Sequence, residues 1–206
     1  MGRYAFLTFD DGYEDNYTNA LPLLRQYGFT AWIFVLPPLV ERQAALSWPE
    51  VADDAAAYPE VMRSLSWKMI EEMAEAGFEI GSHGLRHPHL PQLGDDELTE
   101  ELWQSRTEIK DRLGRCDSFA YPFGEWDDRV EAAAARAGYS FAFTSPSAGQ
   151  RRVGPLTVPR LPIDARDRSW RFRAKLTTPG RTMFLSSVRP ITRKLRSIAR
   201  ARGGDR

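Results

Sequence analysis

The chain of 206 residues contains one cysteine, Cys116, and only three histidines. A lone cysteine excludes an internal disulfide framework and any zinc site built from several thiolates. No run approaches the roughly 20 apolar residues that a membrane-spanning helix needs, so we expect no integral membrane protein. Residues 1–12 also lack the apolar region and small-residue cleavage site of a secretory signal. These absences predict a cytoplasmic location.

The composition predicts a folded domain with a sizeable core. Apolar residues make up 42% of the chain, which includes 6 Trp, 11 Phe and 7 Tyr. This content excludes a disordered protein. The length favours one domain, because domains commonly span roughly 100–200 residues.

The formal net charge of zero hides two regions of opposite charge. Residues 1–164 contain 15 Lys and Arg against 26 Asp and Glu, a balance of −11. Residues 165–206 contain 13 against 2, a balance of +11. The split predicts a basic tail that binds an anionic partner, which could be the acidic body, a membrane surface or phosphates. Nucleic acid is not expected, because no recognition motif accompanies the arginines.

Predicted strands and helices alternate along the body. Strands are expected at residues 4–9, 30–36, 78–80, 118–121, 139–144 and 157–163. Helices are expected at residues 15–27, 67–76, 95–113 and 127–137, each followed by a glycine. Residues 37–64 are expected to form an irregular insertion. The alternation predicts an α/β fold with a parallel sheet and outer helices.

Candidate site residues follow three of the predicted strands. Asp10 and Asp11 come after the first strand, His83 and His87 after the third, and Phe123 after the fourth. In α/β barrels the loops at the carboxyl ends of the strands build the active site. These residues are therefore expected to meet at one rim.

The two histidines have the spacing of metal ligands. His83 and His87 are four residues apart, so both imidazoles could face one point from a helical turn, and neutral imidazole suits zinc. A pair of surface histidines in a loop is the alternative. The zinc-protease motif is excluded, because it requires Glu directly after the first His and this chain has Gly84.

The adjacent carboxylates of Asp10 and Asp11 favour two separate roles, because equivalent neighbours would repel each other. One could bind a cation while the other acts as a base. The alternative is an ordinary turn with Gly12, or a helix cap. Two His and one Asp would form a three-ligand site with open positions, as in catalytic zinc sites.

Three motifs resemble those of the NodB-type polysaccharide deacetylases, carbohydrate esterase family 4. They are Thr8-Phe9-Asp10-Asp11-Gly12, Ser82-His83-Gly84-Leu85-Arg86-His87-Pro88 and Phe119-Ala120-Tyr121-Pro122-Phe123-Gly124. The resemblance implies a distorted (β/α) barrel of about seven strands over residues 1–180, with the insertion at about 37–64. It also implies metal-dependent removal of acetyl groups from acetylated sugars.

The same resemblance implies roles for individual residues. Asp11, His83 and His87 would hold the metal, usually zinc, and Asp10 would be the general base. The backbone N–H of Phe123 would stabilise the oxyanion, with Tyr121 and Trp126 as candidate substrate contacts. Trp126 could stack on a sugar ring, as could Tyr13, although ordinary packing is the alternative for both.

The chain departs from the family pattern at two points. Ala120 stands where the family commonly has an arginine that orients the base, and the late catalytic-acid histidine is missing. Arg160, on the last predicted strand, is expected to take over the role of the missing arginine, with a structural or surface role as the alternative. His89 could be a displaced acid or a solvated loop residue. A barrel that binds glycan without cleaving it is therefore the alternative function.

The predicted tail, residues 181–206, has amphipathic character. Phe184, Val188, Ile191, Leu195 and Ile198 recur at helical spacing among basic residues. A basic amphipathic helix beginning near Pro190 could lie on the inner membrane face as a peripheral contact. The alternative is a helix packed over the body, or a frayed tail.

Overall fold

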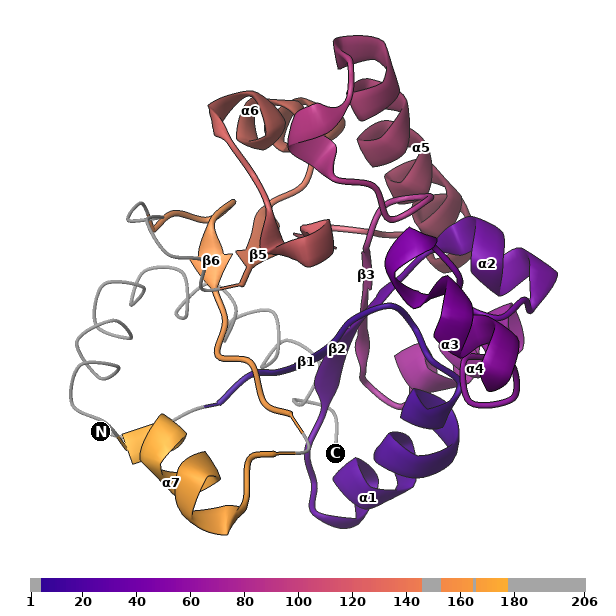
Figure 1. Cartoon of the computed structure of the whole chain (residues 1–206), viewed down its shortest axis with the longest axis vertical. Helices are drawn as coiled ribbons and strands as arrows, with labels where there is room; N and C mark the ends of the chain where they lie inside the picture. Colours follow the sequence, from indigo (N-terminus) through magenta and orange to yellow (C-terminus); the bar gives the residue numbers. More distant parts are fainter. Residues whose placement is uncertain (1–4, 146–152, 165, 178–206) are drawn as a thin grey trace.

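Six parallel strands form one sheet in the order β1-β2-β3-β4-β5-β6. The computed structural model describes residues 5–145, 153–164 and 166–177. The strands are β1 (Leu7–Phe9), β2 (Ala31–Val35), β3 (Glu79–Ser82), β4 (Ser118–Ala120), β5 (Phe141–Thr144) and β6 (Val158–Pro159). The sheet curls into a half-barrel with helices outside (Figure 1). This architecture confirms the predicted fold class, with six strands in the described part of the chain rather than about seven.

The helical segments follow the strands in turn. They are η1 (Asn16–Ala20), α1 (Leu21–Gln26), α2 (Pro37–Arg42), η2 (Pro49–Val51), α3 (Ala52–Ala57), α4 (Trp67–Glu75), η3 (Leu90–Gln92), α5 (Asp95–Leu113), η4 (Pro122–Gly124), α6 (Asp128–Ala137) and α7 (Ser169–Thr177). The predicted helices at 67–76, 95–113 and 127–137 match α4, α5 and α6 to within one residue at each end.

Burial explains why these segments form a sheet covered by helices. All five residues of β2 are buried, because β2 pairs with β1 on one side and β3 on the other and has its two faces covered. On α4, Trp67, Ile70 and Met73 form the buried face, and Ser66 caps the helix by accepting a hydrogen bond from the Met69 N–H at 3.3 Å.

The insertion at 37–64 is more regular than predicted. It contains α2 and α3, which begin soon after β2. Pro37 and Pro38 stand in the first turn of α2, a position at which Pro is favoured because its missing N–H needs no partner there. Leu36, Leu46, Trp48, Ala55 and Met62 form a separate apolar cluster, against which Phe123 also packs. The insertion therefore forms a wall beside the loop that follows β4.

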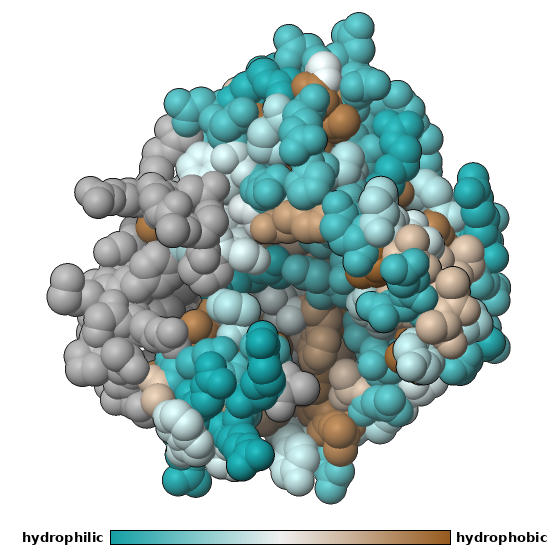
Figure 2. Space-filling model, in the orientation of Figure 1, coloured by the Kyte–Doolittle hydropathy of each residue, from teal (hydrophilic) through white to brown (hydrophobic). Residues whose placement is uncertain are grey.

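The predicted basic helix near Pro190, and the whole 181–206 segment, lie outside the described residues. None of the helices in the described ranges has both the length and the apolar composition required to cross a lipid bilayer. The face seen in Figure 1 is largely hydrophilic, with apolar surface in the hollow at its centre (Figure 2).

Candidate metal centre

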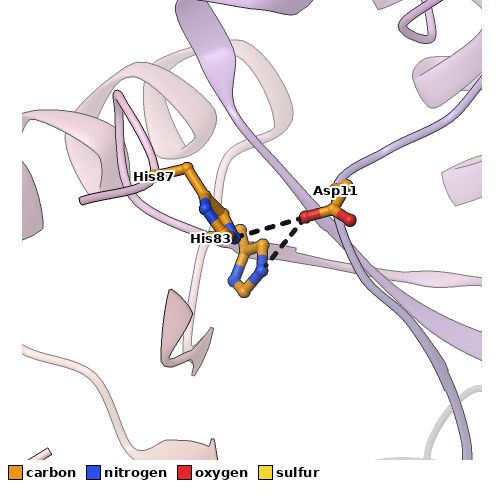
Figure 3. Close-up of side chains that lie close together, drawn as sticks. All are labelled: Asp11, His83 and His87. Carbon is orange, nitrogen blue, oxygen red and sulfur yellow. Dashed lines mark ion pairs between the residues drawn. The ribbon is translucent and has the colours of Figure 1, made fainter. Parts of the chain in front are cut away.

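The side chains of Asp11, His83 and His87 point toward one another at the carboxyl ends of the strands (Figure 3). Asp11 follows β1 by two residues, and His83 comes directly after β3. Asp11 Oδ1 lies 3.3 Å from His83 Nε2 and 3.5 Å from His87 Nε2. One ligand atom from each residue lies within 4.8 Å of the other two. The convergence predicted from the sequence is confirmed.

The two histidines meet through a loop and not through the expected helical turn. Residues 83–89 contain no helix, and the backbone turns at Gly84 (φ 91°) and at His87 (φ 58°). The loop returns His87 to His83, so that their ring centroids are 4.9 Å apart. The four-residue spacing correctly indicated that the two imidazoles lie close together, but the predicted helical turn between them was wrong.

Backbone strain is concentrated around this centre. Four non-glycine residues in the described ranges have positive φ, and three of them are Asp11 (69°), His87 (58°) and Phe123 (57°). Such conformations cost about 1–3 kcal/mol each and are characteristic of functional sites. The fold therefore holds these loops in shapes that local preference alone would not select.

Fixed neighbours orient both imidazoles. His83 Nδ1 lies 2.7 Å from the Ala120 carbonyl oxygen. A carbonyl only accepts, so Nδ1 carries a hydrogen, and Nε2 is the ring nitrogen that faces Asp11. The His87 ring stacks on Trp48 at 4.1 Å and contacts the Phe123 ring edge-on at 4.5 Å. Trp48 was missed in the sequence, because it lies in the insertion and no local pattern links it to His87.

Burial and neighbouring charges shift the pKa values of the two histidines in opposite directions. Burial acts to lower the pKa of His83, but the carboxylates of Asp10 and Asp11 outweigh it and raise the pKa above its usual value. For His87, burial and then repulsion from His83 lower the pKa to about 4. His87 is thus neutral near pH 7, as a metal ligand must be, whereas at His83 a metal would compete with a proton that the nearby carboxylates favour.

The residues present fit a divalent cation. Asp11 Oδ1 and His87 Nδ1 are buried without a hydrogen-bond partner. An unpaired buried polar atom costs about 1–3 kcal/mol, which a shared cation would offset at Asp11. One carboxylate and two imidazoles are donors that zinc accepts, with open positions left over. Within the described ranges, Asp11, His83 and His87 are the cluster of His, Cys, Asp or Glu side chains that lie close enough together to hold a metal ion.

Asp10 faces a different partner from Asp11. Arg160 Nη1 donates to Asp10 Oδ1 at 2.6 Å and Nη2 donates to Oδ2 at 2.7 Å, and Nη1 also reaches Thr8 Oγ1 at 3.2 Å. Burial acts to raise the pKa of Asp10, but His83 and Arg160 outweigh it and lower the pKa. Each carboxylate oxygen keeps a further lone pair, so the ionised Asp10 can still accept a proton.

The sequence profile of the family described as "Polysaccharide deacetylase" matches residues 2–142. The chain belongs to the polysaccharide deacetylase family. Its Asp11, His83 and His87 cluster is consistent with the divalent-metal site of that family.

Individual relatives agree with this assignment. The peptidoglycan-N-acetylmuramic acid deacetylase PdaA of Bacillus subtilis is 28% identical over 146 residues, or 69% of this chain and 47% of PdaA. The Streptococcus pyogenes deacetylase PplD, solved in complex with acetate, has a TM-score of 0.66 at 26% identity and aligns over 82% of this chain and 69% of its own. BC0361, a polysaccharide deacetylase from Bacillus cereus, has a TM-score of 0.63 at 26% identity, with coverage of 84% and 51%. The chain spans about half the length of the curated relatives it matches.

Tyr121 and Trp126, the two aromatic side chains expected at the substrate, stack on each other. Tyr121 is fully buried, its hydroxyl donates to the Leu156 carbonyl at 2.9 Å, and its ring contacts Phe119. The side chain of Tyr121 therefore belongs to the core, and its contact with substrate stays a prediction. Trp126 is partly exposed and stacks on Tyr121, so its contact with a sugar stays a prediction.

His89 lies at the rim of the centre. Its Nδ1 is 2.8 Å from Glu125 Oε2 and its Nε2 is 3.2 Å from Glu50 Oε1. The ring also stacks on Phe123 at 4.1 Å. His89 is thus a linking residue between the insertion and the loop after β4, and not a free solvated histidine.

Proposed function

We propose that the chain is a divalent-metal-dependent hydrolase, with zinc as the metal, that removes N-acetyl or O-acetyl groups from a sugar or polysaccharide. The observation that carries the proposal is the juxtaposition of two different aspartates. Asp11 faces two imidazole nitrogens, and Asp10 is held apart by Arg160. Membership of the deacetylase family supports the substrate class.

The metal would be held by Asp11 Oδ1, His83 Nε2 and His87 Nε2, and would supply Lewis-acid activation of the acyl carbonyl and of water. Asp10 accepts the proton of the attacking water as general base. Arg160 keeps that carboxylate ionised and fixes its orientation through two charge-assisted hydrogen bonds. The Phe123 N–H donates to the developing oxyanion. Asp10 then returns its proton to the leaving amine or alcohol. In this step Asp10 takes the role of the missing acid histidine.

Asp10→Asn is the variant that tests this division of roles. It should lower acetate release from acetylated chito-oligosaccharides by about 10²–10⁴-fold, the range expected for loss of a general base. Bound zinc, measured by elemental analysis, should stay at one ion per chain. Asp15→Asn, at an exposed aspartate in the segment between β1 and η1, should retain full activity. Loss of zinc together with activity would show that the roles of the two aspartates are reversed.

A glycan-binding barrel without hydrolysis is the second candidate. It is motivated by the absence of any histidine beyond His83, His87 and His89. Stoichiometric zinc with retained glycan binding, but no acetate released from a broad panel of acetylated sugars, would favour this candidate.

The cytoplasmic location and the peripheral membrane contact of residues 181–206 stay predictions. Flotation with anionic liposomes, comparing the full chain with a chain that ends at residue 180, tests the membrane contact. Equal recovery of the two chains would contradict it.

A further inference from the structure

Glu101 is a buried acid that the proposed reaction does not use. It lies on α5, on the same buried face as Leu98, Leu102 and Ser105, and its side chain has no solvent exposure. Burying a carboxylate is costly unless hydrogen bonds compensate for the lost water. Its partners therefore explain why an acid occupies this position.

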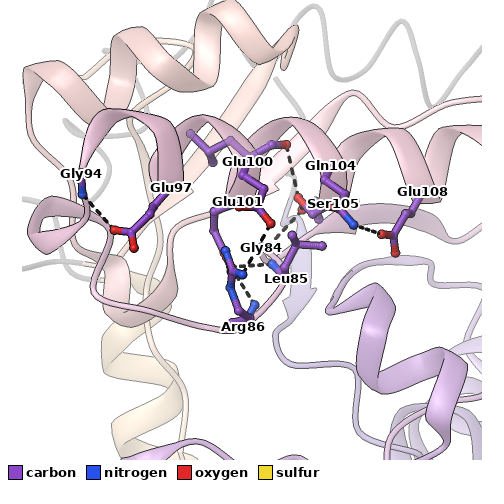
Figure 4. Close-up of polar contacts among 12 residues, drawn as sticks. Gly84, Leu85, Arg86, Gly94, Glu97, Glu100, Glu101, Gln104, Ser105 and Glu108 are labelled. Carbon is purple, nitrogen blue, oxygen red and sulfur yellow. Dashed lines mark hydrogen bonds and ion pairs between the residues drawn. The ribbon is translucent and has the colours of Figure 1, made fainter.

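Among the described residues, the hydrogen bonds to the Glu101 carboxylate all come from the segment between the two histidine ligands (Figure 4). Oε1 accepts from the backbone N–H of Leu85 at 2.6 Å and from that of Arg86 at 2.7 Å. Oε2 accepts from Arg86 Nε at 3.0 Å. One carboxylate thus fixes two consecutive backbone amides in the middle of the His83–His87 loop.

The loop is shaped to approach this carboxylate closely. A Cβ atom at Gly84 would lie 2.8 Å from Glu101 Oε1, and Gly84 also has a φ of 91°. Glycine therefore meets both requirements at once, the left-handed backbone and the contact with the acid. The same segment ends at His87, whose own positive φ is unfavourable for a residue with a side chain.

We propose that Glu101 is a positioning residue that holds the His83–His87 loop in the shape that presents both Nε2 atoms to Asp11. The proposal rests on the proposed function for the metal itself. Without the carboxylate, the N–H groups of Leu85 and Arg86 lose their acceptor inside the protein, and the loop has to open for them to reach water. His87, at the end of the loop, then leaves the position that a metal requires.

Two variants of Glu101 should give graded effects on zinc affinity, measured on metal-free protein by competition with a chromophoric chelator. Glu101→Leu removes every acceptor and should weaken zinc binding about 10–100-fold, the range for loss of a residue that supports a metal ligand. In Glu101→Gln the amide oxygen can still accept both backbone N–H groups, and only the contact with Arg86 Nε is lost. Its zinc affinity should therefore lie between those of Glu101→Leu and the native chain. Cobalt(II) absorption spectra should change in the same order.

Two control variants on α5 separate positioning from general stability. Glu100→Gln removes the neighbouring acid, which is 52% exposed and reaches Arg86 Nη1 at 3.6 Å without touching the loop backbone. Leu102→Ala opens a cavity at a core residue with no exposure, and should lower the melting temperature. Both should bind zinc with native affinity.

Hydrogen exchange of the metal-free chain supplies a readout that does not depend on metal. The Leu85 and Arg86 amides should exchange faster in Glu101→Leu, and should stay protected in Leu102→Ala at temperatures well below unfolding. If the native chain bound no zinc, the proposed function would fail, and this exchange pattern would still test the role of Glu101. Native zinc affinity and native amide protection in Glu101→Leu would overturn the proposal, as would an equal loss of affinity in Leu102→Ala.

Discussion

Ser82 and His83 are neighbours at the end of β3, but they belong to regions of opposite character. On the helix side, Ser82 Oγ lies 2.7 Å from Ser105 Oγ, Ser105 Oγ lies 3.2 Å from the Tyr139 hydroxyl, and Tyr139 donates to the Leu102 carbonyl at 3.0 Å. On the other side, Asp11 Oδ1 and His87 Nδ1 are buried without hydrogen-bond partners.

The difference shows what each region is built for. The network of Ser82, Ser105 and Tyr139 is closed, since each hydroxyl has a partner in the protein, and such networks make a fold rigid. The Asp11, His83 and His87 centre is open, since it leaves buried polar atoms unpaired and carries strained backbone. The protein thus has a satisfied scaffold directly behind an unsatisfied centre, where a shared cation would give Asp11 Oδ1 a partner.

The largest expected effect is on zinc affinity, after removal of a side chain from the open region. His87→Ala removes one of two imidazole ligands, so zinc affinity should fall by more than about 100-fold, beyond the range expected for supporting residues. Zinc at about 100 times its dissociation constant should stabilise the native chain by about 2.7 kcal/mol. Thermal unfolding with and without zinc checks this, because at the same concentration zinc should stabilise the variant by less than about 0.4 kcal/mol. An equal shift in both chains would place the metal elsewhere.

The next variant changes Arg160, which lies at the edge of the open region. Arg160→Met removes both hydrogen bonds to Asp10. Hydrogen bonds to charged groups contribute about 1.5–3 kcal/mol, so acetate release should fall by about 10–100-fold. Zinc affinity should not change, because within the described part of the chain the Arg160 side chain donates its hydrogen bonds to Asp10 and Thr8 and to none of the three ligands.

The matched control for this change is Arg166→Met. Arg166 is 85% exposed, and its ion-pair partner among the described residues is the nearby Asp164. Native activity in Arg160→Met would remove the proposed role of Arg160 and leave its contact with Asp10 a structural one.

The smallest effect on the site should come from the closed network. Tyr139→Phe removes one hydroxyl and leaves the Leu102 carbonyl without that donor. The free energy of unfolding, measured with urea, should fall by about 1–3 kcal/mol. Zinc affinity and acetate release should both stay at native levels. A drop in zinc affinity as large as that of Glu101→Leu would show that the two regions are not separate.

The sequence was sufficient to predict that Asp11, His83 and His87 converge, because each lies within a few residues of the end of a recognisable strand. The choice of Asp11 over Asp10 as the metal-binding carboxylate rested on the family resemblance. Asp10 and Asp11 follow β1, and His83 follows β3, so parallel pairing alone brings them to one rim. The shape of the connecting loop was not predictable. The left-handed conformations of Asp11, His87 and Phe123 are imposed by contacts between distant segments and have no local signature.

Glu101 shows a signal that was present in the sequence and missed. Within an acidic helix it resembles any exposed carboxylate, but the positions of Leu98, Leu102 and Ser105 place residue 101 on the buried face. An acid at such a position indicates a specific set of donors. Trp48 carried no comparable signal, because its stacking on His87 depends on how the insertion folds against the rim.

Anomalous X-ray diffraction from zinc-soaked crystals, recorded on both sides of the zinc absorption edge, tests the central claim most directly. A single peak is expected at about 2.0–2.2 Å from Asp11 Oδ1, His83 Nε2 and His87 Nε2, the distances typical of zinc bound to oxygen and nitrogen ligands. Density showing the three side chains in place, with no peak between them or with the zinc bound at another position, would contradict the account.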